Sequence, residues 1–165
     1  MTERDRELIV EEKLKHWKRI RAEVRDAEEE AANVAFSQGS GEPVQSSSIS
    51  DKTARGAAVL DRVEEQVRWI ECIRDGLEWL RDEQPDLRRI LIGHYGMRHN
   101  RGYKAKHAAA FTLEYCRCYH ISVSEYKLRR REALHQIASL AVEYGLISNR
   151  KEKIKVRPGC EKTVL

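Results

Sequence analysis

The feature that most constrains the fold is the stretch from Glu3 to Phe36, which contains neither glycine nor proline. Its apolar residues are three or four positions apart and charged residues fill the other positions, which is the pattern of an amphipathic helix. The apolar positions are Val10, Leu14, Trp17, Ile20, Val24, Ala27, Ala31 and Val34. A single helix of this length would extend for about 50 Å. Because a compact core cannot cover so long and narrow a stripe, the sequence predicts an amphipathic helix over 1–36 with a coiled-coil partner.

Two further segments complete the expected assembly module. Serine, glycine and proline dominate residues 37–50, a composition typical of a flexible linker. Helical spacing resumes near Asp51 and ends before Pro85, because proline disfavours helical geometry in the residue before it. We therefore expect a second amphipathic helix over 51–84. The two helices would form an antiparallel hairpin or coiled coil, which we expect to pair between subunits in a homodimer.

The distribution of charge separates this module from the rest of the chain. The formal net charge is only +4, but residues 90–165 carry 15 basic and 6 acidic side chains, whereas residues 1–89 are net acidic. An excess of cations in one part of a chain favours an acidic partner such as nucleic acid, although a solvated basic face would give the same count. The basic residues continue into a tail at 148–165, which is either an arm that follows a DNA backbone or a solvated terminus.

A third helical block follows Pro85. Its apolar spacing predicts a short helix that ends near Gly96, because glycine can adopt the left-handed conformation of a helix cap. A loop is expected from there to Gly102. The next residues, 104–111, fit either a helix or a continuation of that loop. This block leads into the most informative part of the sequence.

A helix-turn-helix motif is expected between Thr112 and Gly145. Thr112 is a suitable N-cap for a first short helix, and residues 120–122 would form a tight turn. Ser122 and Glu125 have the spacing of a capping box, so a second helix should begin there and continue to Gly145. Two helices joined by a short turn, the second beginning with polar and basic residues, are typical of proteins whose second helix enters the major groove of DNA.

The helical period assigns different roles to the basic residues of this expected DNA-binding domain, which extends over 86–147. At about 100° per residue, the side of the second helix opposite the apolar stripe would face the groove, and the first turns of a recognition helix contact base edges. The predicted base contacts are Ser124, Lys127, Leu128 and Arg131. The predicted phosphate contacts are Arg129 and Arg130, together with Arg117 on the first helix. The alternative is an ordinary helical hairpin with a solvated, arginine-rich face.

One segment resembles a known signature: residues 121–138, ISVSEYKLRRREALHQIA, are similar to those of phage-encoded transcriptional regulators of the ArpU and RinA type. The likeness extends over about residues 50–147. It implies a sigma-factor-like helix-turn-helix, activation of late genes in a temperate phage or prophage, promoter DNA as partner, and host RNA polymerase as a second candidate partner. It also supports the same groove face, Ser124, Lys127, Leu128 and Arg131. The sequence departs from the pattern at Arg130, where sigma-like helices have an apolar residue, and in the long stretch 93–111.

Other kinds of site receive little support. Cys116, Cys118 and His120 suggest zinc ligands, but alternate residues of a helix point about 200° apart and the sequence has no Cys-x-x-Cys pair. The scattered acids of the last part do not form the carboxylate cluster of a metal-dependent nuclease, and the common phosphate-binding and nucleophile motifs are absent. We therefore expect no enzyme, no metal and no cofactor, and buried reduced thiols at Cys72 and Cys116.

The chain has no apolar run of the roughly 18 residues that a transmembrane helix needs, and its first six residues lack the apolar region of a secretory signal. We therefore expect a protein of the bacterial host cytoplasm without a membrane partner. Two alternatives to a transcriptional regulator stay open. One is a DNA-packaging protein such as a terminase small subunit. The other is a helical protein-interaction module that binds no nucleic acid.

Overall fold

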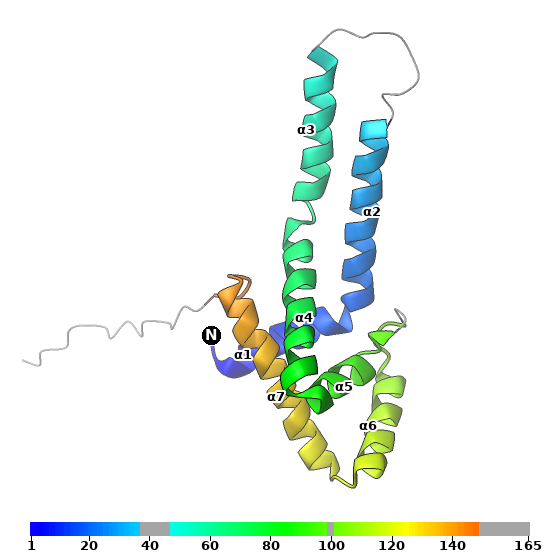
Figure 1. Ribbon diagram of the computed structural model, residues 1–165, viewed down its shortest axis with the longest axis vertical. Coiled ribbons are helices and arrows are strands. Elements are labelled where there is room, and N and C mark those ends of the chain that lie inside the picture. The colour runs from blue at the N-terminus through cyan, green and yellow to red at the C-terminus, as the bar shows by residue number, and fades with distance from the viewer. Residues whose placement is uncertain (37–46, 99–100, 149–165) are drawn as a thin grey trace, which may run out of the picture.

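The computed structural model describes residues 1–36, 47–98 and 101–148, and within these ranges the protein is all-α, with seven helices and no strand (Figure 1). This confirms the all-α class expected from the helical spacing. The helices are α1 (Glu3–Lys15), α2 (Trp17–Phe36), α3 (Ser47–Asp61), α4 (Glu64–Glu83), α5 (Pro85–His94), α6 (Ala105–Tyr119) and α7 (Val123–Glu143). Figure 1 shows α2 and α3, the projection, extending away from α1 and α4 to α7, the head. No helix in the described ranges is long and apolar enough to cross a bilayer.

The helix expected over 1–36 is divided at His16, and α1 and α2 lie at a steep angle to each other (Figure 1). Val10 and Leu14 of α1 are fully buried in the core of the head, while Val24 and Ala27 of α2 are buried in the projection. The apolar stripe is therefore covered from two directions within one chain. The expectation of a coiled-coil partner assumed one straight helix, whereas the bend at His16 divides the stripe between two helices.

The helix expected over 51–84 is also divided, at Arg62 and Val63, into α3 and α4. α2 lies beside both of these helices. The side chains buried between them are Val24, Ala27, Val59 and Val63. The linker expected at 37–50 lies outside the described residues up to position 46, and its last four residues belong to α3.

The core of the head contains residues of α1, α4, α5, α6 and α7. Its largest buried side chains are aromatic: Trp69 on α4, Tyr95 just after α5 and Tyr126 on α7 are each no more than 1% exposed. Cys72 and Cys116 are buried and free, as the sequence predicted, and burial raises the pKa of the Cys72 thiol to about 12. Because large apolar side chains contribute most to burial free energy, the head carries more of the stability than the projection does.

Two glycines determine how α5 is connected to α6. Gly96 adopts the left-handed conformation expected for it, with φ +61°, and a Cβ at this position would lie 2.4 Å from the carbonyl oxygen of Gly102. Gly93 is the contact point for Phe111 of α6, because a Cβ there would lie 2.1 Å from the aromatic ring. These close approaches hold α6 against α5. The sequence left open whether residues 104–111 form a helix or continue the loop. All of them except Lys104 belong to α6, so they are helical.

Gly93→Ala should lower the free energy of unfolding by about 1–3 kcal/mol, because the added methyl group must displace the Phe111 ring. Gly56→Ala is the matched control. Gly56 lies in α3 with no atom within 4 Å of its Cβ position, so the same substitution should stabilise that helix by about 0.5–1 kcal/mol. Urea unfolding followed by circular dichroism measures both changes. Effects of the same sign and size would contradict the close contact at Gly93.

Candidate nucleic-acid interface

The turn between α6 and α7 lies at the end of the head that is farthest from the projection (Figure 1). α6 ends at Tyr119, and His120 takes the left-handed conformation with φ 52°. Ile121 is partly buried against the core. Ser122 then caps α7, since its Oγ accepts a hydrogen bond from the N–H of Glu125 at 3.0 Å. A three-residue turn therefore joins the two helices at the predicted position.

Two local details differ from the expectation. Thr112 is not an N-cap, because α6 begins at Ala105 and the Thr112 hydroxyl donates to the carbonyl oxygen of Ala108 at 2.8 Å. The capping box is incomplete, because Arg129 Nη2 donates to the carboxylate of Glu125 at 2.7 Å. An exposed ion pair of this kind contributes only about 0.3–0.5 kcal/mol, so Arg129 can exchange the carboxylate for a phosphate.

The first two turns of α7 expose three of the four predicted base contacts: Ser124, Lys127 and Leu128. Leu128 is 67% exposed. Lys127 forms no ion pair with any residue that the structure describes, and the same holds for Arg117, which is exposed on α6. These side chains are free to meet a ligand.

Arg131, the fourth predicted base contact, binds another part of the protein. Its Nε lies 2.8 Å from Oε2 and 3.1 Å from Oε1 of Glu7 on α1, and the Glu7 side chain is only 3% exposed. Arg4 Nη1 approaches the same carboxylate at 3.1 Å. A buried carboxylate needs such partners, because an unpaired buried charge is costly. Arg131 therefore bridges α7 to α1, and its side chain is still 52% exposed, so a base contact would require it to leave Glu7.

Arg130, a predicted phosphate contact, also points inward. Its Nη1 lies 2.7 Å from Nε2 of His94 on α5 and 3.7 Å from Oε1 of Glu11 on α1. A guanidinium only donates, so Nε2 of His94 accepts, and the ring proton is on Nδ1, which lies 3.1 Å from the Tyr126 hydroxyl. Burial and the positive charge of Arg130 lower the pKa of His94 to about 4, so the ring is neutral at pH 7. Arg130 thus links three helices, and its side chain is only 23% exposed.

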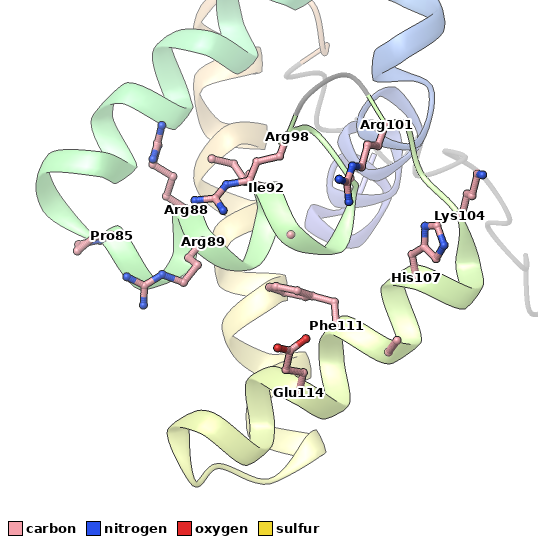
Figure 2. A pocket seen from close by; sticks show the side chains of 14 residues that line it. Pro85, Arg88, Arg89, Ile92, Arg98, Arg101, Lys104, His107, Phe111 and Glu114 are labelled. Carbon is pink, nitrogen blue, oxygen red and sulfur yellow. The ribbon is translucent and has the colours of Figure 1, made fainter.

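A second cationic surface, which helical spacing did not reveal, lies between α5 and α6. A cavity of about 880 Å³ is lined by both helices and by the segment that joins them (Figure 2). We call it the basic cavity. Its basic lining residues are Arg88 and Arg89 on α5, Arg98 and Arg101 on the joining segment, and Lys104 and His107 at the start of α6. They come from three segments with no common period. The excess of cations after residue 90 hinted at four of them, and nothing in the sequence singled out Arg88 and Arg89.

The described residues contain no group of three histidine, cysteine, aspartate or glutamate side chains placed to hold a metal ion. Cys116 is buried and Cys118 is exposed, as expected for alternate residues of one helix. Comparisons of the chain with protein-family models, with curated proteins and with solved structures find no match. The function must therefore be argued from the residues of the site itself.

Glu7→Gln should lower the free energy of unfolding by about 1–3 kcal/mol, because it leaves Arg131 and Arg4 without their shared carboxylate. Glu12→Gln is the matched control on the same helix, since Glu12 is exposed and pairs with His16. This second change should cost less than about 0.5 kcal/mol. Urea unfolding at neutral pH compares the two variants. Equal, small losses would show that the Glu7 carboxylate does not stabilise the fold.

His94 should make stability depend on pH between about 6.5 and 4. On acidification the unfolded chain takes up a proton at its ordinary pKa, whereas the folded protein does so only near pH 4. The free energy of unfolding should therefore decrease as the pH falls through this window. His94→Gln keeps an acceptor for Arg130 and a donor for Tyr126, and should remove this contribution. Urea unfolding of both proteins at about pH 7 and pH 4.5 is the measurement. A constant difference between them would contradict the buried neutral ring.

Proposed function

We propose that this protein binds duplex DNA in a sequence-specific manner and regulates transcription. The observation that carries the proposal is the exposed face at the start of α7, where Ser124, Lys127 and Leu128 follow the Ser122 cap. The major groove is wide enough for one α-helix and presents a different pattern for each base pair. In this assignment α6 and α7 form a sigma-factor-like helix-turn-helix, and α7 is the recognition helix.

Each exposed side chain suits a different kind of contact. Ser124 can donate to or accept from a base edge, Lys127 can donate to guanine O6 or N7, and Leu128 can cover a thymine methyl group. Arg117 on α6 and Arg129, once released from its exposed ion pair, would bind phosphates beside the groove. The face therefore combines base contacts with backbone contacts, as a sequence-specific protein requires.

Transcription is favoured over other uses of a recognition helix by the resemblance of residues 121–138 to regulators of the ArpU and RinA type. The specific form of the proposal is activation of late genes of a temperate phage, in the bacterial cytoplasm, with host RNA polymerase as a further partner. Arg130 and Arg131 act indirectly in this scheme. They hold α7 against α5 and α1 and so position the face that meets DNA.

Selection of bound duplexes from a random library tests the proposal. The full chain should enrich a defined motif. Changing both Lys127→Ala and Leu128→Ala should weaken binding to that motif by about thirtyfold or more, because each good base contact contributes about 1–3 kcal/mol and two are lost. Weak binding that decreases with salt should persist, since phosphate contacts do not depend on sequence.

Arg25→Ala is the matched control, because Arg25 is an exposed cation on α2 that pairs with the neighbouring Asp26. It should leave both affinity and motif unchanged. Circular dichroism should show that the Lys127 and Leu128 variant folds normally, as neither side chain is buried. If that variant binds the selected site as tightly as the unchanged protein at every salt concentration, α7 is not the recognition helix.

The oligomeric state separates this function from DNA packaging. We expect a homodimer, which presents two recognition helices, so footprinting should show two half-sites separated by one or more turns of the duplex. Light scattering of the full chain, free and bound to the selected duplex, gives the stoichiometry. A large closed ring of subunits would instead favour a protein of the terminase small subunit type.

A further inference from the structure

The basic cavity is independent of the α7 face that we propose to read DNA. Its described lining residues belong to α5, α6 and the segment between them, and none belongs to α7 (Figure 2). A ligand can therefore occupy the cavity without touching Ser124, Lys127 or Leu128. We propose that the basic cavity is a binding site for the phosphate groups of a nucleotide, either free or within a nucleic-acid strand.

The positive charge of the cavity is poorly balanced. Arg98, Arg101 and Lys104 form no ion pair with any residue in the described part of the chain. Glu114 is the one acidic side chain among the described lining residues. Cations held around one cavity repel each other, so an anion between them lowers the free energy of the arrangement. Phosphate is the anion that fits best, because a guanidinium can donate two parallel hydrogen bonds to it.

The start of α6 adds backbone donors to the cavity wall. Lys104 and His107, at either end of its first turn, both line the cavity. The first hydrogen bond of the helix runs from the N–H of Ala108 to the carbonyl oxygen of Lys104 at 3.0 Å, so the three preceding N–H groups have no acceptor within the helix. No side chain caps this end, and its first turn contains no acidic residue. Such a helix start attracts anions through its free N–H groups and its positive dipole end.

Two arginines of α5 line the cavity, and they differ in their hydrogen bonds. Arg89 donates to Asp86 at 3.4 Å and to the Tyr119 hydroxyl. The Nε of Arg88 is buried and has no hydrogen-bond partner among the described residues. A buried donor without an acceptor is costly. Arg88 also lines the cavity, so its guanidinium adds positive charge to this wall, while its buried Nε lies out of a ligand's reach.

The size and floor of the cavity favour a nucleotide over an isolated phosphate ion. Its volume of about 880 Å³ is typical of small-molecule sites. Ile92, Gly93 and Phe111 form an apolar part of its lining. Figure 2 shows the Phe111 ring extending from α6 toward α5, with Arg98 and Arg101 on the joining segment above it. An aromatic ring beside cations can hold a base while the cations hold its phosphates.

Calorimetric titration of the full chain with inorganic triphosphate and with ATP tests this proposal. Both should bind, and ATP should bind more tightly because of the apolar floor. Changing both Arg98→Ala and Arg101→Ala should weaken binding by about tenfold or more, since two charge-assisted donors are lost. The matched control removes two exposed cations from α2, Arg19→Ala with Arg25→Ala, and should bind as the unchanged protein does.

Duplex binding by the same variants identifies the source of the phosphate. If the ligand is a free nucleotide, the Arg98 and Arg101 variant loses ATP binding and keeps its affinity for the selected DNA site. If the ligand is a DNA strand, this variant binds duplex more weakly, and the slope of log affinity against log salt decreases by about two, one for each lost phosphate contact. ATP binding that survives the double change, or no ATP binding together with unchanged DNA affinity, overturns the proposal. Neither result bears on the sequence preference assigned to Lys127 and Leu128, so the two proposals fail separately.

Discussion

Two buried carboxylates, Glu7 and Glu11, determine where the N-terminal helix lies, and the rest of the architecture follows from that placement. Any arrangement of α1 that covered them without cations would leave unpaired charge in the core, at a cost of several kcal/mol. Arg4 and Lys15 of α1 itself supply part of that charge, and Arg131 and Arg130 of α7 supply the cations that tie α1 to another helix. With α1 fixed across α7, the chain must turn at His16 before α2 can enter the projection, and α2 in turn lies along α3 and α4.

Local chemistry made part of the site predictable from sequence. The turn at 120–122 and the Ser122 cap depend only on neighbouring residues, and both lie where capping and helical spacing indicated. The roles of Arg130 and Arg131 depend on α1, since Arg131 and Glu7 are 124 positions apart in the chain. A helical period shows which side of one helix is apolar and carries no information on which other helix covers it. The sequence did contain one signal of these ion pairs. Glu7 and Glu11 are acidic residues that lie on the same helical face as the apolar residues Val10 and Leu14.

Charge counting located an excess of cations after residue 90 but could not show which of them are paired with carboxylates. Three of the four basic residues of α7 are matched by carboxylates, so their charge is largely cancelled. The pairs are Arg129 with Glu125, Arg130 with Glu11 and Arg131 with Glu7. The unmatched positive charge lies instead on the α5 and α6 side, in a loop and at helix ends. Such positions have no periodic pattern, so spatial proximity and not sequence spacing defines the basic cavity.

The contact between α1 and α7 also has a consequence for the order in which the protein forms on the ribosome. Glu30 and Arg62 of the projection are 32 positions apart, whereas the partners Glu7 and Arg131 are separated by nearly the whole described chain. α1 therefore emerges with its two carboxylates in water and has no ionic partner on α7 until that helix has been synthesised. The projection can assemble in the meantime, because loops of moderate length close early. The head is completed last, so an interrupted nascent chain has the projection but not the surface that we propose to bind DNA.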